Sequence, residues 1–213
     1  MIFDYARARK RMVQEPLVSR GINDPRVLRA MAKVPRHLFL EGDLWPRAYE
    51  DHPLPIGANQ NISQLYIVGL MVEALELTGA ERVLEIGTGS GYAAAVLSEL
   101  CAEVYSIETV ENLVLKARAL LSSLGCKNVS VLMGDGTLGW DEHSPYEAVL
   151  ISAAAPCIPR PLVQQLKKPG YLVLPMGEQE LQTLVRIRKD EAGIREDYLG
   201  ECHFVKLKGT YGW

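Results

Sequence analysis

Short apolar runs alternate with segments of helical periodicity through most of the chain. Runs rich in valine, leucine and isoleucine have the length of buried strands, at residues 82–86, 103–108, 129–133, 147–152 and 171–175. Between the first three of these runs, apolar residues recur at helical spacing near residues 91–100 and 111–124. This alternation predicts an open α/β sheet, in which ligands bind at the carboxyl ends of the strands.

Helical patterns also precede the first strand. Residues 5–18 combine mixed charge with apolar spacing, and Asp24 followed by Pro25 predicts the N-cap and first turn of a second helix that runs to residue 32. Residues 64–76 carry an apolar stripe, and Gly79 is expected to end that helix. The stretch between the last two helices is predicted to be irregular, because prolines interrupt it at Pro35, Pro46, Pro53 and Pro55.

Two alternating segments follow the fifth strand, at residues 181–188 and 202–207. Their pattern predicts a pair of antiparallel strands that completes the sheet. With 213 residues, of which 48% are hydrophobic, the chain is long enough to bury the core of one domain. We therefore predict a single domain over residues 1–213, with a helical elaboration over residues 1–60 and an α/β core over residues 61–213.

The turn after the first strand contains an acidic residue followed by three glycines. Glycines at such a turn allow a sharp bend and a close approach of ligand to backbone. The dinucleotide fingerprint G-x-G-x-x-G fits poorly, because Tyr92 occupies the place of its third glycine. Glu85 would also bring negative charge toward a pyrophosphate, whereas it suits a cationic ligand. The pattern E-x-G-x-G-x-G resembles the first motif of methyltransferases that use S-adenosylmethionine (AdoMet), which makes candidate cofactor-binding residues of Glu85, Gly87, Thr88, Gly89, Ser90 and Gly91.

Acidic residues also follow the next two strands. Glu108 lies about 20 residues beyond the glycine turn, where a carboxylate can accept hydrogen bonds from both hydroxyls of a ribose. It could instead cap the following helix. Asp135 and Gly136 follow the third strand, and Asp135 could be an ordinary turn residue. In methyltransferases, an acid at this place commonly lies near the adenine amino group. The three strand ends together present groups suited to one nucleoside-like ligand.

Charge, cysteine and histidine content narrow the function classes. The net charge of −3 and the isoelectric point near 5.9 give no reason to expect nucleic acid as a partner. No secretory leader pattern and no apolar run of membrane-spanning length is present, so no membrane association is predicted. The four cysteines form no C-x-x-C pair, which favours reduced thiols in the cytoplasm. The four histidines lack metal-ligand spacing, so no metal is predicted.

The segment before the glycine turn indicates a particular family. Residues 49–64 read Y-E-D-H-P-L-P-I-G-A-N-Q-N-I-S-Q, which closely resembles the signature P-I-G-x-G-Q-T-I-S-Q-P of the protein-L-isoaspartate O-methyltransferases. Further segments agree with this family in the same order, at residues 20–37, 83–97, 134–140, 153–156 and 204–207. The resemblance covers nearly the whole chain. It implies a Rossmann-like AdoMet methyltransferase sheet with N-terminal helices and a C-terminal antiparallel strand pair.

The resemblance also implies an activity. Members of this family transfer the methyl group of AdoMet to the free carboxylate of L-isoaspartyl residues in damaged peptides and proteins, and the ester then cyclises to a succinimide that hydrolyses partly to normal aspartate. The carboxylate is already ionised at neutral pH, so positioning, which can lower a barrier by roughly 7–11 kcal/mol, replaces a strong base. The family pattern places the catalytic hydroxyl at Ser63, which could also be the N-cap of the helix that begins at Gln64. Substrate contacts are expected from Asn61, Ile62 and Ala154.

Three positions depart from the family signature, all on the acceptor side. Asn59 replaces a glycine, Asn61 replaces a threonine and Leu65 replaces a proline. Asparagine tolerates positive φ, so Asn59 can keep the turn that glycine allows. Asn61 is the more consequential change, because it puts a larger amide beside the expected carboxylate site. The sequence therefore supports AdoMet binding more strongly than isoaspartyl specificity.

Three other functions remain open from the sequence alone. The chain could methylate another peptide carboxylate, or it could bind AdoMet without turnover, as a sensor or an inactive paralogue. An NAD-linked dehydrogenase is the third alternative, and both Glu85 and Tyr92 disfavour it.

Overall fold

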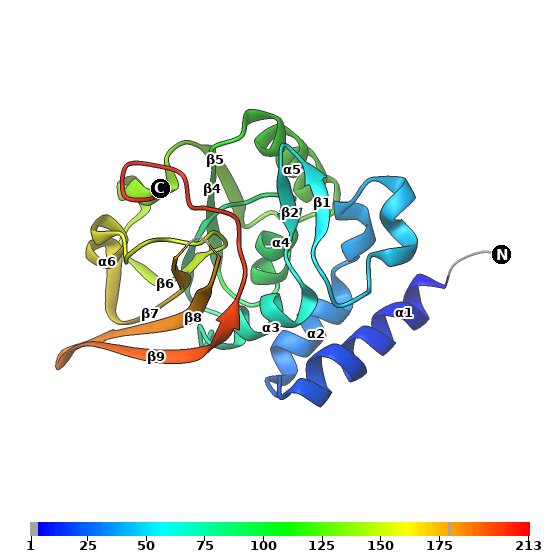
Figure 1. The fold of residues 1–213 in the computed structure, drawn as a ribbon, viewed down its shortest axis with the longest axis horizontal. Helices are drawn as coiled ribbons and strands as arrows, with labels where there is room; N and C mark the ends of the chain where they lie inside the picture. The colour runs from blue at the N-terminus through cyan, green and yellow to red at the C-terminus, as the bar shows by residue number, and fades with distance from the viewer. Residues whose placement is uncertain (1–3, 179) are drawn as a thin grey trace.

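The computed structural model describes residues 4–178 and 180–213. A seven-stranded sheet lies at the centre, and the N-terminal helices gather on one side of it (Figure 1). The α-helices are α1 (Tyr5–Met12), α2 (Pro25–Lys33), α3 (Leu65–Glu73), α4 (Tyr92–Ser98), α5 (Glu111–Ser123) and α6 (Arg160–Gln165). The strands are β1 (Leu54–Gly57), β2 (Gln60–Ile62), β3 (Arg82–Ile86), β4 (Glu103–Glu108), β5 (Val129–Met133), β6 (Tyr146–Ile151), β7 (Leu166–Gly177), β8 (Gln182–Asp190) and β9 (Gly193–Cys202).

The strand order β5-β4-β3-β6-β7-β8-β9 creates a crevice near the middle of the sheet. β3 pairs in parallel with β4 on one side and with β6 on the other. The connections that leave β3 and β6 therefore diverge, and open α/β sheets bind ligands where this occurs. Beyond β7 the sheet turns antiparallel through β8 and β9. The predicted fold class is confirmed.

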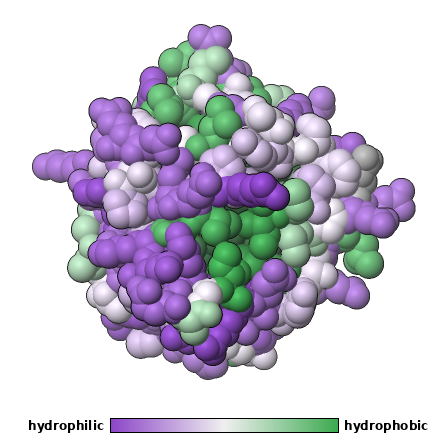
Figure 2. Space-filling view, turned by 90° about the vertical axis from the view of Figure 1, so that its left-hand side faces the viewer, coloured by the Kyte–Doolittle hydropathy of each residue, from purple (hydrophilic) through white to green (hydrophobic). Residues whose placement is uncertain are grey.

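Alternating side chains of the strands pack into two cores, one on each face of the sheet. Val83 joins the larger core, which also takes in the N-terminal helices, whereas its neighbour Leu84 joins the smaller core beside α6. Both side chains are fully buried. Seen from the side of α6, the surface is largely hydrophilic, and a hydrophobic patch occupies a central hollow (Figure 2). The division into residues 1–60 and 61–213 within one domain stays a prediction.

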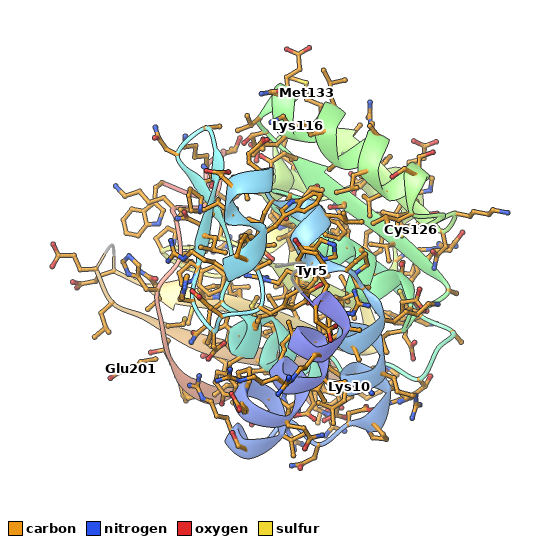
Figure 3. All side chains as sticks on the ribbon, turned by 90° about the vertical axis from the view of Figure 1, so that its right-hand side faces the viewer. Tyr5, Lys10, Lys116, Cys126, Met133 and Glu201 are labelled. Carbon is orange, nitrogen blue, oxygen red and sulfur yellow. The ribbon has the colours of Figure 1, made fainter. Side chains whose placement is uncertain are left out.

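The N-terminal helices differ from prediction in length. α2 begins as expected, because the Asp24 side chain accepts a hydrogen bond from the Arg26 N–H at 2.7 Å and Pro25 occupies the first turn. The helix predicted over residues 5–18 is wrong in extent, since α1 ends at Met12 and a π-helical turn follows. Pro16 lies within that turn and has no N–H to donate, so a regular α-helix cannot continue there. In the view of Figure 3, α1 with Tyr5 and Lys10 lies in the lower centre, and α5 with Lys116 lies above it.

A short hairpin, β1–β2, occupies part of the stretch predicted to be irregular. Its strands pair antiparallel, and the turn between them places Ala58 and Asn59 at φ of 52° and 55°. Asn59 therefore keeps the left-handed backbone expected of the glycine it replaces. The hairpin escaped prediction because each strand is only three or four residues long and one contains a proline.

The strand predicted over residues 202–207 is wrong. The partner of β8 is β9, which ends at Cys202, and residues beyond it run back across the sheet (Figure 1). There Lys206 forms a single parallel bridge with Ala154. β9 is exposed along almost its whole length and carries several charges. Charged residues on an edge strand prevent its association with other strands. Because they replace apolar residues, the alternating pattern that would reveal a strand is absent from β9. α6 was also missed, in the stretch between the fourth and fifth predicted strands.

Candidate active site

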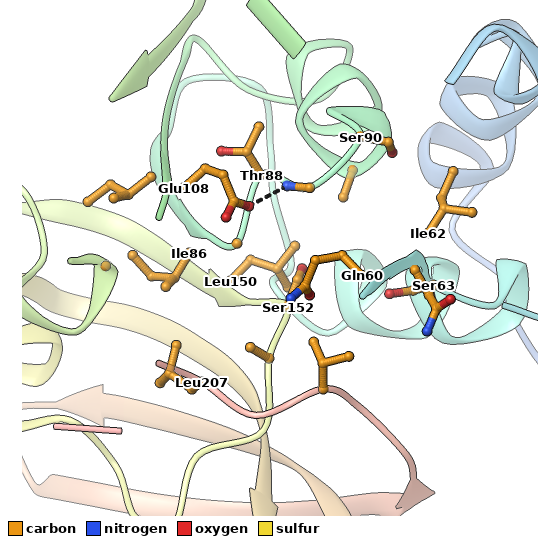
Figure 4. Close-up of a pocket in the computed structure, with 18 of the residues that line it drawn as sticks. Gln60, Ile62, Ser63, Ile86, Thr88, Ser90, Glu108, Leu150, Ser152 and Leu207 are labelled. Carbon is orange, nitrogen blue, oxygen red and sulfur yellow. Dashed lines mark hydrogen bonds between the residues drawn. The ribbon is translucent and has the colours of Figure 1, made fainter. Parts of the chain in front are cut away.

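A cavity opens at the carboxyl ends of β3, β4 and β6 (Figure 4). Three parts of the chain that are distant in sequence form its walls: the β2 strand with the start of α3, the turns after the three strands, and residues 205–208. The cavity lies where the strand order predicts a ligand. The polar residues and glycines that line it include Gln60, Asn61, Ser63, Gly87, Thr88, Gly89, Ser90, Glu108, Gly136, Ser152, Lys206 and Lys208.

The turn after β3 presents main chain to the cavity. Gly87 and Gly89 have φ of 90° and 54°, in the left-handed region that favours glycine. The N–H of Gly87 donates to the Ile107 carbonyl at 2.8 Å, which ties the turn to β4. A Cβ added to Gly89 would lie 3.4 Å from Ile56 of the hairpin, so the two loops approach each other closely. A ligand can therefore lie directly against the backbone of this turn.

Glu108 lines the cavity at the end of β4 and is only 7% exposed. One carboxylate oxygen accepts a hydrogen bond from the Gly89 N–H at 2.8 Å (Figure 4). The other accepts from the N–H groups of Thr109 and Val110 at 2.8 and 3.0 Å. Both groups precede Glu111, the first residue of α5, and the N-cap is Val110 without a side-chain cap, so the interpretation of Glu108 as the helix cap is wrong. A carboxylate can accept about four hydrogen bonds, so the oxygen facing Gly89 keeps capacity for a ligand hydroxyl.

Glu85 lies beneath the glycine turn and not in the cavity wall. It is fully buried, the Ser106 hydroxyl donates to one of its oxygens, and Ser106 lies 2.5 Å from the Thr88 hydroxyl. The other oxygen, Oε1, has no hydrogen-bond partner among the described residues. Burial, opposed in part by the Ser106 hydrogen bond, raises the pKa of Glu85 to about 8. Glu85 therefore reaches the cavity only through Ser106 and Thr88, of which Thr88 lines it.

Ser63 lines the cavity just before α3, and a buried cation holds its backbone. The Ser63 carbonyl accepts a hydrogen bond from Nη2 of Arg36 at 2.7 Å, while Nε of the same guanidinium donates to the Ala48 carbonyl at 2.8 Å. Arg36 is fully buried, and burial lowers its pKa to about 10, so the group is charged at neutral pH. The N-cap of α3 is Gln64, so the interpretation of Ser63 as the cap is wrong.

Nine of the predicted site residues line the cavity, and four do not. The nine are Asn61, Ile62, Ser63, Gly87, Thr88, Gly89, Ser90, Glu108 and Gly136. The four outside the wall are Glu85, Gly91, Asp135 and Ala154. Gly91 is the N-cap of α4 and has φ of 89°. The remaining two, Asp135 and Ala154, bind the C-terminal segment, which crosses the cavity.

Asp135 and Ala154 both fasten the C-terminal segment. One Asp135 oxygen accepts hydrogen bonds from Thr137, and the other accepts from the N–H and hydroxyl of Thr210, each at 2.8 Å. Burial acts to raise the pKa of Asp135, but these hydrogen bonds outweigh it and lower the pKa below its usual value. The Ala154 carbonyl accepts from the Leu207 N–H at 2.8 Å and from the Trp213 indole at 3.1 Å.

Sequence reasoning missed the wall made by residues 205–208, as well as Gln60 and Ser152. Ser152 could have been found, because it follows β6 at the same sheet edge as Gly87 and Glu108. Residues 205–208 carry no such signal, since hydrogen bonds to distant residues set their position. Among the described residues, no group of three or more metal-ligating side chains could hold an ion. No helix within the described ranges is both long enough and apolar enough to cross a bilayer.

Curated relatives match the chain along its whole length. The family model for protein-L-isoaspartate(D-aspartate) O-methyltransferases matches residues 7–212. The chain is 53% identical to the protein-L-isoaspartate O-methyltransferase of Geobacter metallireducens, over 100% of this chain and 98% of the relative. It is 54% identical to protein-L-isoaspartate O-methyltransferase 2 of Geotalea uraniireducens, over 97% of this chain and 95% of the relative.

Solved structures agree. A protein-L-isoaspartate O-methyltransferase superposes with a TM-score of 0.84 at 27% identity, over 96% of this chain and 67% of that one. A Plasmodium falciparum structure, described as a putative protein-L-isoaspartate O-methyltransferase in complex with S-adenosyl-L-homocysteine, shares the fold with a TM-score of 0.81 at 22% identity, over 97% of this chain and 99% of that one. The family predicted from the sequence is confirmed: the chain belongs to the protein-L-isoaspartate O-methyltransferases.

Proposed function

We propose that the cavity is where this AdoMet-dependent protein-L-isoaspartate O-methyltransferase methylates the free carboxylate of L-isoaspartyl residues, which starts repair of damaged peptides through a succinimide. One observation carries the proposal. The glycine turn and Glu108 share a single cavity with Asn61, Ile62 and Ser63, so a nucleoside site and a carboxylate site adjoin each other.

The residues present fit AdoMet in shape and in donor set. The turn at Gly87 and Gly89 offers backbone at close approach, and a Cβ at Gly136 would overlap Ile86, so no side chain can fill that part of the wall. Glu108 offers a carboxylate oxygen to a ribose hydroxyl. Ser106 and Thr88 connect the Glu85 carboxyl group to the same turn. When bound, AdoMet supplies a methyl group on a positively charged sulfur.

The chain's part in the reaction is to bind, orient and desolvate the acceptor. The substrate carboxylate is ionised at neutral pH, so no residue has to remove a proton from it. The Ser63 hydroxyl donates a hydrogen bond to one carboxylate oxygen, and Arg36 holds the Ser63 backbone so that the hydroxyl keeps its place. The buried positive charge of Arg36 beneath this position also favours an anion. Positioning of this kind supplies a large share of the rate enhancement.

Isoaspartyl and aspartyl residues differ in whether one methylene lies in the main chain or in the side chain. An apolar pocket distinguishes such a difference only about 10–200-fold, whereas polar groups left unpaired by the wrong substrate can reach roughly 10⁴–10⁵-fold. Backbone and side-chain groups at residues 61–63 and near Ala154 are our candidates for these contacts. Asn61 lines the cavity and is exposed, so its amide can change the set of donors that the acceptor meets.

A pair of peptides tests the proposal. An isoaspartyl peptide and its aspartyl twin are incubated with radiolabelled AdoMet, and label is expected in the isoaspartyl peptide alone. The values of kcat/KM for both peptides are then compared in the natural protein and in Asn61→Thr. Equal labelling of the two peptides by both proteins would mean that the acceptor is another carboxylate. No labelling of either peptide, with AdoMet still bound, would indicate a non-catalytic AdoMet-binding protein.

We also propose the cytoplasm as the compartment, with isoaspartyl-containing peptides and proteins as partners and no nucleic acid. The four cysteines are free, and Cys101 is buried with a pKa that burial raises to about 12, so its thiol is unreactive. Cys157 is exposed, which suits a reducing environment. Fractionation of cells followed by immunodetection tests the location.

A further inference from the structure

The position of Ser63 depends on the start of α3. Ser63 lies where the chain passes from β2 into α3, directly before the N-cap Gln64 (Figure 4). Within the described part of the chain, the Gln64 side chain makes no capping hydrogen bond. The first N–H groups of an α-helix have no partner inside the helix, so this start needs a partner from elsewhere in the chain. A group that fixes the start of α3 also fixes Ser63, its immediate neighbour.

Asp51 caps α3 from the loop before β1. Its Oδ1 accepts a hydrogen bond from the N–H of Tyr66, the second residue of the helix, at 2.8 Å. Its Oδ2 and its backbone carbonyl both accept from Nε2 of Gln64, each at 3.0 Å. A helix N-cap side chain ordinarily accepts from the second or third helical N–H, and here a residue from another segment takes that place. The negative charge also suits the positive end of the helix dipole.

Arg20 fixes the Asp51 carboxylate in turn. Nη1 of Arg20 lies 2.8 Å from Oδ2 of Asp51, and the guanidinium carbon lies 3.5 Å from the centre of the Tyr66 ring. The Asp51 side chain is 23% exposed, so salt screens this ion pair less than a pair on the open surface. Arg20 therefore holds Oδ2 and leaves Oδ1 directed at the helix.

Ser63 is thus held by two separate charged groups. Nη2 of Arg36 binds its carbonyl at 2.7 Å, and Asp51 binds the residue that follows it and the first turn of α3. Ser63 lines the cavity, whereas Asp51 lies outside the cavity wall. Asp51 can therefore affect the reaction only through the groups that it holds in place.

We propose that Asp51 is a positioning residue, which sets the place of the Ser63 hydroxyl against the acceptor carboxylate by capping α3 from outside the helix. The inference rests on the proposed function and deepens it, because it gives part of the acceptor geometry to a residue that contacts no ligand. A displacement of about 1 Å can lower a reaction rate by about 100-fold. Loss of the cap should therefore lower kcat and leave AdoMet affinity unchanged.

Substitutions at Asp51 test the inference with an isoaspartyl peptide and AdoMet. Asp51→Ala removes the cap, whereas Asp51→Asn keeps a carbonyl oxygen that can still accept from the Tyr66 N–H. Asp51→Glu keeps the charge but shifts the carboxylate by one methylene, and it replaces Asp51→Ala if that variant does not fold. Each variant is also combined with Ser63→Ala. The measurements are kcat, KM, the Kd of AdoMet by calorimetry and the melting temperature.

Glu73→Ala is the matched control. Glu73 is the last residue of α3, and its carboxylate accepts hydrogen bonds from the N–H groups of Asn23 and Asp24 at 2.7 and 2.6 Å. It is therefore another acidic side chain that binds main-chain N–H groups at α3, but at the end of the helix away from Ser63. Its removal should lower the melting temperature without a change in kcat.

We expect Asp51→Ala to lower kcat by about 10–100-fold and Asp51→Asn to recover most of that loss. In the Ser63→Ala background, the loss of Asp51 should lower kcat no further, because residues that act through one group are not additive. A natural kcat in both Asp51→Ala and Asp51→Glu overturns the inference. So does a loss that multiplies with that of Ser63→Ala, or one that weaker AdoMet binding explains in full. If the natural protein methylates no isoaspartyl peptide, the proposed function is refuted and the inference falls with it.

Discussion

Replacement of Glu85 by glutamine tests the consequence of burying a carboxyl group under the glycine turn. The folded pKa of Glu85 is about 8, against an ordinary value of 4.5. A carboxyl group with a raised folded pKa binds its proton more tightly in the native state than in the unfolded state. Its ionisation therefore lowers the free energy of unfolding progressively as the pH rises from 4.5 to 8. A carboxylate in a salt bridge has the opposite pH dependence, because its stabilising effect is lost as the pH falls.

The magnitude follows from the shift. One pKa unit corresponds to about 1.4 kcal/mol, so the free energy of unfolding should fall by about 1.4 kcal/mol per pH unit through this window. The full shift amounts to roughly 4–5 kcal/mol, and the part between pH 5.5 and 7.5 to roughly 2–3 kcal/mol. Glutamine keeps the size of the side chain and can still accept the Ser106 hydrogen bond, but it carries no charge at any pH. The variant should therefore gain stability relative to the natural protein as the pH rises.

Urea unfolding at pH 5.5, 6.5, 7.5 and 8.5 measures this difference, and other titrating groups cancel between the two proteins. Glu111→Gln, at an exposed position at the start of α5, controls for the loss of one glutamate. A difference between Glu85→Gln and the natural protein that stays constant from pH 5.5 to 8.5 would refute the reasoning. It would mean that Glu85 keeps an ordinary pKa despite its burial.

Two further predictions concern the cavity. Glu108→Ala should weaken AdoMet binding by roughly 1.5–3 kcal/mol, the usual size of a hydrogen bond to a charged group, and calorimetry that finds the same Kd in a folded variant would remove Glu108 from the ribose site. Ser63→Ala should lower kcat while AdoMet affinity stays nearly unchanged, because its hydroxyl is assigned to the acceptor and not to the cofactor. If turnover persists in Ser63→Ala, Ser63 is not a catalytic residue, and Arg36 only fixes the local backbone.

The sequence predicted features whose cause is local. Asp24 caps α2 because its side chain lies next to the N–H groups that it satisfies. Asn59 adopts positive φ because a tight hairpin turn demands it. The parallel strands were found because residues buried on both faces form short apolar runs, as in β6. β9 was misplaced for the opposite reason, since an exposed edge strand needs no apolar pattern.

Features that depend on distant contacts could not be predicted in the same way. Asp135 was expected near an adenine, but its carboxylate accepts hydrogen bonds from Thr210, which lies 75 positions later. The motif locates Asp135 at the sheet edge and does not reveal which group it binds there. Likewise, Lys206 and Lys208 resemble ordinary surface lysines until Ala154 places them beside the cavity. The half of the site formed by strand ends was therefore predictable, and the half formed by the returning chain was not.

The order of protein synthesis determines when the cavity wall made by the C-terminal segment can form. Residues 205–208 form a cavity wall, and Thr210 and Trp213 hold that wall through Asp135 and Ala154. Because translation proceeds from the N-terminus, the sheet and the glycine turn are made well before this wall exists. A chain still attached to the ribosome, with these residues inside the exit tunnel, has an open-sided cavity. The complete binding site therefore forms only after residues 205–213 have left the exit tunnel.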